Sequence, residues 1–377
     1  MSKQNKIVLV IILILIAIGM SWYGLSQKQS QPVSQANEPI KIGHSTALTG
    51  DVAAYGEMEK TGADLAVAEI NAKGGINGRQ LVIVREDDKG DPAQSVTAIN
   101  KLIGVDKVSA VIGMLSSGGT LAAAPVAEKS KTVLLSAGAG SVKISNAGDY
   151  TFRIYPSTAQ EVDILLELAK KLEKNNGAIL YAANDFGTDL NEIALQKAPG
   201  QGINILISEG YDAEGTDFRT QLTKIAAKDP DVIFLFGYPK DMGLIMKQVG
   251  AMGIKTQFLA PDPFGEISIG IAKSAANGVI SVQPSNETSA AFKEAFKAKY
   301  GNDPSSISAM DYDAVNLLAL AIQRGGNNGT AIKNELYKIK DYAGASGTIT
   351  IDSNGDAINR PMVLNIVKDG KLVPYQQ

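Results

Sequence analysis

The sequence predicts an α/β protein with two doubly wound lobes joined by a multi-strand hinge and preceded by an N-terminal hydrophobic helix. Short apolar runs alternate with amphipathic stretches along most of the chain, which is typical of doubly wound architecture. The apolar runs lack polar alternation, as strands buried on both faces of a parallel sheet do. Eight such runs exceed one small sheet, so two similar lobes fit the 377 residues better.

The first half begins with a β-loop-α-β unit at Ile40. Its loop, 46–55, is rich in small residues and would lie at the carboxyl edge of a parallel sheet, where open α/β folds bind ligands. We expect strands at Ile40–Gly43, Leu81–Val84, Ala110–Ile112 and Val133–Leu135, and helices over Tyr55–Asn71, Ala93–Gly104 and Thr120–Lys129.

The second half repeats this alternation. Between Gln160 and Leu172, apolar residues recur at helical spacing, which predicts an amphipathic helix there. We expect strands at Ala178–Tyr181, Ile203–Ser208, Val232–Phe236 and Gln257–Leu259, and helices over Ala159–Lys174, Leu190–Lys197, Asp217–Lys228 and Met242–Met252.

Two breaks in the pattern suggest where the chain passes between lobes. One is the extended segment Phe152–Thr158 and the other is Gln283–Asn286. We expect the two helices after Asn286 to return to the first lobe and the final strand, Met362–Val367, to cross again. The first lobe then comprises 40–156 plus 286–345, and the second comprises 157–285 plus 346–377.

The N-terminus reads as an export segment, with residues 1–25 forming a signal or anchor helix and residues 26–39 a flexible tether. Lysines precede the apolar run Ile7–Met20, and Trp22 and Tyr23 suit the outer membrane interface. Ser34-Gln35-Ala36 is a candidate cleavage site, but it lies far from the apolar run, so we favour an uncleaved anchor. Either alternative places the rest of the chain outside the cytoplasm.

Composition excludes several kinds of site. With no cysteine and one histidine, His44, the chain has no disulfides, no thiolate zinc site and no cysteine nucleophile. The formal net charge of −3 argues against nucleic acid as a partner. We expect no enzyme activity, no cofactor and no metal. The stretch Asp352–Asp356 starts like a calcium loop but lacks the sixth-position glycine, so we interpret it as a turn.

Several motifs resemble those of the leucine/isoleucine/valine-binding proteins, which are type I periplasmic binding proteins that serve ABC transporters. The motifs are NAKGGINGRQLVIVREDDKGDPAQSV, GMLSSGGTLAAAPVAEKSKTVLLSAGA, AEGTDFRTQLTKI and KTQFLAPDP, and the similarity runs from about Ile40 to Val373. The resemblance implies two α/β lobes that close over a ligand held between them.

Ser116 and Ser117 begin a predicted helix, whose unpaired N–H groups and dipole favour a ligand carboxylate. From the residues alone, Ser117 is equally a helix cap; the resemblance implies that it binds the ligand carboxylate. In the loop that includes Ala139, the resemblance implies that the Gly138 carbonyl accepts from the ligand ammonium. A family hydroxyl aligns with Gly140, so this chain departs from the pattern; the neighbouring Ser141 is the alternative.

On the second lobe, the resemblance implies that Asp262, where the family usually has Glu, pairs with the ligand ammonium. The alternative is a turn aspartate between two prolines. The apolar walls of the site match Tyr55, Leu115, Phe186 and Tyr238, with Ile307 a weaker candidate and His44 a packed core residue.

The function expected from these features is that of a solute-binding protein of an ABC transporter. Its ligand would be a branched-chain or related aliphatic amino acid, and its partners the permease subunits and, through the N-terminal helix, the membrane. The alternatives are a membrane-tethered sensory receptor of the same fold and a binder of another small amide or carboxylate.

Overall fold

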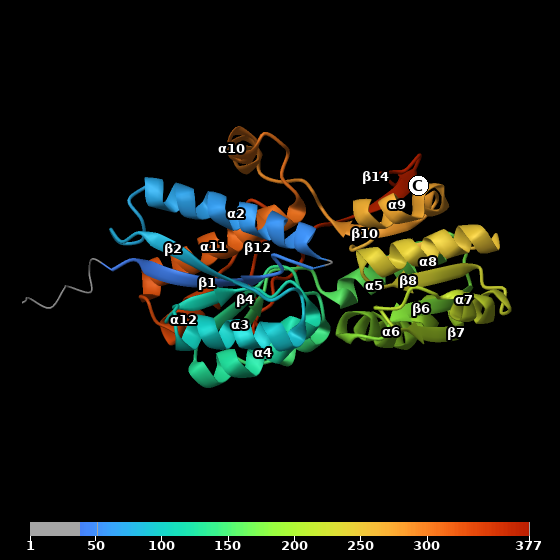
Figure 1. The fold of residues 1–377 in the computed structure, drawn as a ribbon, viewed down its shortest axis with the longest axis horizontal. Helices are drawn as coiled ribbons and strands as arrows, with labels where there is room; N and C mark the ends of the chain where they lie inside the picture. The colour runs from blue at the N-terminus through green and yellow to red at the C-terminus, as the bar shows by residue number, and fades with distance from the viewer. Residues whose placement is uncertain (1–37, 51, 377) are drawn as a thin grey trace, which may run out of the picture. The chain divides into compact units, whose positions relative to one another are not determined.

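The computed structural model describes residues 38–50 and 52–376 (Figure 1). The expected export helix and nearly all of the tether lie outside the described residues. From Ile40 onwards the chain forms one compact unit. None of the helices within the described ranges is both long and apolar enough to cross a bilayer.

The first lobe is built on a five-stranded parallel sheet. Its strand order is β2-β1-β3-β4-β5, so the chain winds outward in both directions from β1. The strands are β1 (Ile40–Thr46), β2 (Leu81–Asp87), β3 (Ala110–Ile112), β4 (Val133–Ser136) and β5 (Thr151–Arg153). Every residue of β3 and β4 is buried, as expected of central strands covered on both faces.

Helices cover both faces of this sheet (Figure 1). One face packs against α2 (Ala53–Ala72), α11 (Ser306–Gly325) and α12 (Gly329–Leu336), and the other against α3 (Pro92–Gly104) and α4 (Ser117–Ser130). Successive side chains of β3 point to opposite faces of the sheet, so Ile112 packs into the core on the first face and Val111 into the core on the second. The helix α10 (Ala290–Tyr300) adds a smaller aromatic cluster beside α2.

The second lobe has a seven-stranded mixed sheet of order β14-β13-β10-β9-β8-β6-β7. Five strands are parallel: β6 (Asn176–Ala182), β7 (Asn204–Tyr211), β8 (Val232–Phe236), β9 (Gln257–Ala260) and β10 (Ile280–Pro284). The hairpin of β13 (Met362–Lys368) and β14 (Lys371–Pro374) extends the sheet in antiparallel fashion. One face packs against α5 (Thr158–Lys171) and α6 (Asp185–Lys197), and the other against α7 (Arg219–Ala226), α8 (Pro239–Met252) and α9 (Glu266–Ala272).

The described chain passes between the two lobes three times: after β5, after β10 and before β13. Ahead of the last passage, β11 (Tyr342–Gly344) and β12 (Gly347–Ile349) form a small hairpin. Ile349, Ile351 and Ala357 still pack into the first core, so the chain enters the second sheet only at Met362.

The sequence patterns missed several elements, among them β5, β10, α9 and α12. The strand β5 is only three residues long and contains an arginine, so it carries no apolar run. The helix α12 begins with glycine, and α9 has only seven residues. The eight apolar runs expected to form parallel sheets do pair in parallel, and the β13–β14 hairpin adds antiparallel strands at one side of the second sheet.

Candidate functional site

A cavity of about 50 Å³ lies between the two lobes, and most of its lining residues follow the carboxyl ends of parallel strands. Among the described residues, the cavity is lined by Val52, Tyr55, Leu115, Ser117, Gly138, Tyr155, Phe186, Tyr238, Pro239, Asp262, Pro263 and Ile307. The loops after β1, β3 and β4 contribute from the first lobe, and those after β6, β8 and β9 from the second. The site therefore needs both lobes.

The N-terminus of α4 borders the first-lobe side of the cavity, because Ser117 lines it. Ser116 is the N-cap: its Oγ accepts from Gly119 N–H at 3.1 Å and donates to the Gly90 carbonyl at 3.2 Å. Ser117 follows in the first turn, and its buried Oγ accepts from Ser141 N–H at 3.2 Å. The capping role belongs to Ser116, which leaves the Ser117 hydroxyl at the cavity.

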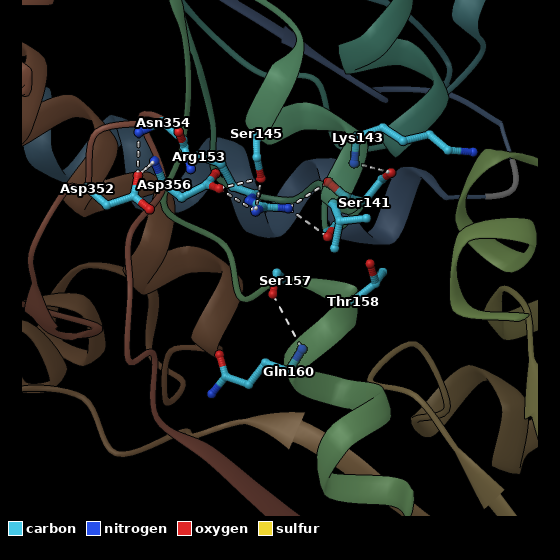
Figure 2. Close-up of polar contacts among 12 residues, drawn as sticks. Ser141, Lys143, Ser145, Arg153, Ser157, Thr158, Gln160, Asp352, Asn354 and Asp356 are labelled. Atoms are coloured by element: carbon cyan, nitrogen blue, oxygen red, sulfur yellow. Dashed lines mark hydrogen bonds and ion pairs between the residues drawn. The ribbon is translucent and has the colours of Figure 1, made fainter. Parts of the chain in front are cut away.

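Arg153, a buried arginine at the end of β5, binds the loop that follows β4. Its Nη1 donates to the carbonyl oxygens of Gly140 and Ser141, at 2.7 Å each. Figure 2 shows the guanidinium between Ser141 on one side and Ser145 and Asp356 on the other. These bonds fix the course of the loop whose Gly138 lines the cavity.

The turn Asp352–Asp356 supports Arg153 from the first lobe. The Asp352 Oδ1 accepts the backbone N–H groups of Asn354 and Asp356, at 2.8 and 3.0 Å, and Asp356 Oδ2 lies 2.9 Å from Arg153 Nη2 (Figure 2). The turn expected from the sequence is present. Its link to the site joins residues about 200 positions apart, so no sequence pattern could indicate it.

The second lobe presents one acid, Asp262, to the cavity. Burial raises the pKa of its carboxyl to about 8, because a charge there loses its hydration. Tyr55 faces Asp262 from the first lobe: burial and then the charges of Asp262 and Glu266 raise the pKa of the Tyr55 phenol, which therefore stays neutral. A cation from outside the protein would restore the charged form of Asp262.

The apolar wall on the second lobe is a stacked aromatic pair. Phe186, in the first turn of α6, and Tyr238, the N-cap residue of α8, have ring centroids 5.3 Å apart and planes within 18°. Burial, followed by the charges of Asp241 and Asp185, raises the pKa of the Tyr238 phenol. Leu115 and Ile307 complete the apolar surface from the first lobe.

The structure brings most of the predicted residues together and leaves some apart. Tyr55, Leu115, Ser117, Gly138, Phe186, Tyr238 and Asp262 line the cavity, and so does the weaker candidate Ile307. Ser116, Ala139, Gly140 and Ser141 do not line it; Ser116 borders a wider neighbouring groove, and Ser141 Oγ accepts from Lys143 N–H. His44 is buried in the first lobe, where its Nδ1 accepts from Arg85 Nε at 3.3 Å.

Sequence reasoning missed four lining residues: Val52, Tyr155, Pro239 and Pro263. Pro239 and Pro263 directly follow the predicted site residues Tyr238 and Asp262, so their position next to these residues could have indicated that they line the cavity. Tyr155 belongs to the first passage between the lobes, and only the crossing of the chain at that point brings it to the cavity.

The arrangement suits a small zwitterion. Helix N–H groups at one side favour an anion, and a buried acid at the other favours a cation, with apolar walls beside them. In the described part of the chain, no cluster of three or more His, Asp or Glu side chains has the arrangement of a metal site.

Comparisons with known proteins agree with this fold. Residues 39–371 match the Periplasmic binding protein family. The Leu/Ile/Val-binding protein of Escherichia coli is 30% identical over 328 residues, which are 85% of this chain and 88% of that protein. The Pseudomonas aeruginosa protein named for binding leucine, isoleucine, valine, threonine and alanine is 28% identical over 334 residues, 86% of this chain and 89% of that protein.

Two solved structures show the same architecture. The leucine-binding protein LivK of Thermotoga maritima superposes with a TM-score of 0.83 at 27% identity, covering 89% of this chain and 98% of that one. The branched-chain amino acid transporter substrate-binding protein LivJ of Streptococcus pneumoniae, solved with isoleucine, gives 0.79 at 32% identity, covering 89% and 97%. The chain thus belongs to the periplasmic binding protein family, in the group that includes the Leu/Ile/Val-binding proteins.

Proposed function

We propose that this chain is an extracytoplasmic solute-binding protein of an ABC transporter, and that it binds a branched-chain or related aliphatic amino acid between its lobes. The proposal rests on one observation: a group that favours an anion and a group that favours a cation line the same cavity from different lobes. The α4 N-terminus with Ser117 would hold the ligand carboxylate, and Asp262 with the Gly138 carbonyl would hold the ammonium.

The ligand side chain would lie against Leu115, Ile307 and the Phe186–Tyr238 pair. A leucine side chain has four carbons, so its burial would contribute roughly 3 kcal/mol at about 0.8 kcal/mol per methylene. The names of the relatives, which specify leucine, isoleucine and valine, support the same ligand class.

The remaining parts of the proposal concern partners and location. The chain would deliver its ligand to permease subunits, would catalyse no reaction, and would be exported or anchored through residues 7–25. The lobe boundaries proposed from the sequence are 40–156 plus 286–345 and 157–285 plus 346–377; because Ile349, Ile351 and Ala357 pack into the first core, we propose that the last boundary lies between Ala357 and Met362. Binding of the ligand-loaded protein to the purified permease tests the transport role against a purely sensory one.

Isothermal titration of the protein with each of the twenty amino acids tests the ligand class. We expect leucine, isoleucine or valine to bind with micromolar or tighter affinity. Small amides, and carboxylates that lack an amino group, serve as controls and should bind far more weakly. Tight binding of such a control, with none of the aliphatic amino acids bound, would contradict the proposal.

Two substitutions test the site assignment. Ser117→Ala removes a hydrogen bond to a charged group and should weaken binding by about 1–3 kcal/mol. Asp262→Ala should weaken it more, by about 3–5 kcal/mol, because it removes the acid that lines the cavity opposite the buried ammonium. If both variants bind leucine as the unaltered protein does, these residues are not the ligand contacts.

A further inference from the structure

A second acid lies beside Asp262 and has no assigned role. Glu161 is in the first turn of α5 and is completely buried. Its Oε2 accepts from Asp262 N–H at 3.2 Å, whereas its Oε1 has no hydrogen-bond partner in the part of the chain that the structure describes. A buried carboxyl oxygen without a donor is costly, so this oxygen calls for a donor that the folded chain does not itself supply.

The unpartnered oxygen faces the loop that borders the cavity. A Cβ atom placed on Gly140 would lie 3.7 Å from Glu161 Oε1 and 3.3 Å from Thr158 Cγ2. Because residue 140 is glycine, it presents no side chain to the unpartnered Glu161 oxygen. Glu161 itself does not line the cavity, but its other oxygen is bound to the backbone of Asp262, which does.

The neighbouring charged groups are engaged elsewhere. Arg153 Nη1 is bound to the carbonyls of Gly140 and Ser141, and its Nη2 to Asp356 and Ser145 (Figure 2). Asp189, on α6, accepts from Thr158 Oγ1 at 2.6 Å and from Val142 N–H at 2.9 Å.

Burial raises the pKa of Glu161 to about 8, opposed by the hydrogen bond from Asp262 N–H. No Lys or Arg side chain among the described residues is close enough to lower the pKa of Glu161. The missing partner of Glu161 is therefore a donor, preferably a cationic one, that enters the cleft.

We propose that Glu161 is a second acidic contact for the ligand ammonium, and that it forms a three-part ammonium pocket with Asp262 and the Gly138 carbonyl. This inference rests on the proposed function and adds to it a residue that selects for an amino group. An ammonium has three N–H donors, so it satisfies three acceptors at once, including the unpartnered Oε1.

Glu161→Gln is the informative variant because it keeps the size of the side chain. The glutamine Oε1 would stay on Asp262 N–H, which turns the amide nitrogen, a donor, toward the ammonium. We expect the affinity for L-leucine, measured by isothermal titration at pH 7, to fall about tenfold to hundredfold, the usual range for a hydrogen bond to a charged group. Glu167→Gln, an exposed position on the same helix, is the matched control and should bind normally.

Two further measurements separate ligand contact from a structural role. A thermal melt shows whether Glu161→Gln is folded; a folded variant that binds L-leucine like the unaltered protein overturns the inference and leaves the proposed function intact. A crystal structure of the unaltered protein with L-leucine is decisive even if the variant fails to fold: a distance of about 3 Å from the ligand nitrogen to Glu161 Oε1 supports the contact, and a separation beyond hydrogen-bond reach overturns it. If the unaltered protein binds no amino acid, the proposed function fails first.

Discussion

At the scale of single residues, Arg153 shows how a buried charge positions a loop. It is 2% exposed and holds Gly140, Ser141 and Asp356. Arg153→Met would remove the counter-charge of the Asp356 carboxylate and the two bonds from the guanidinium to the loop carbonyls, so we expect the free energy of unfolding to fall by about 3–5 kcal/mol. Urea denaturation measures this. Arg219→Met, which breaks the exposed pair with Asp217, is the control and should change stability by less than about 1 kcal/mol.

The raised carboxyl pKa values predict how stability depends on pH. Burial raises the pKa of both Asp262 and Glu161 to about 8, whereas both carboxyls titrate near 4 in an unfolded chain, at about 3.9 for Asp and 4.3 for Glu. Between about pH 4 and 8 the native protein keeps protons that the unfolded chain releases, so the free energy of unfolding without ligand falls as pH rises through that window.

Asp262→Asn isolates the contribution of one of these groups. The variant lacks the titrating carboxyl at 262, so its stability should fall less steeply between pH 5 and 8 than that of the unaltered protein. Urea denaturation at several pH values, without added amino acid, gives both slopes. Equal slopes would show that Asp262 is ionised in the native cleft.

At the scale of secondary-structure elements, the close packing of α2 against α11 depends on a glycine. A Cβ on Gly62 would overlap the Ser308 carbonyl of α11. Gly62→Ala should therefore force the helices apart and lower stability by about 1–3 kcal/mol, as overpacking usually does. Gly104, the last residue of α3, has open space at the same position, so Gly104→Ala should instead raise stability by about 0.5–1 kcal/mol. Thermal or urea unfolding of the two variants tests the contrast.

The same scale explains why element prediction succeeded unevenly. The strands β3, β4 and β8 are buried along their whole length, and their apolar runs are plain in the sequence. The edge strand β7 and the second-last strand β13 are only half-buried, and β5 carries Arg153 because a distant turn supplies its counter-charge. Apolar pattern predicts burial on a sheet face, not the order or direction of pairing.

At the scale of the whole molecule, three passages between the lobes permit opening and closing. In the described structure, contacts across the cleft include the bond from Val142 N–H to Asp189 and the ion pair of Lys143 with Glu192, whose N–O distance is 3.7 Å. We expect L-leucine to shift the protein toward its closed form, because the ligand contacts both lobes only when they are together. Small-angle X-ray scattering should show a smaller radius of gyration with leucine than without it.

Ser117→Ala provides the matched comparison for closure. Because it weakens the first-lobe contact, it should reach the compact form only at higher leucine concentration. An unchanged radius of gyration in the unaltered protein, at saturating leucine verified by titration, would contradict closure as the binding mechanism.

The sequence by itself determined the alternating α/β pattern, the family resemblance and seven cavity residues at strand ends, because these depend on local periodicity and short motifs. The tertiary structure decided what joins distant segments: Tyr155 at the cavity, the Arg153–Asp356 pair, and Glu161 beside Asp262. These contacts link residues far apart in the chain, and a buried acid or arginine is recognisable as such only when the surrounding fold has removed its water.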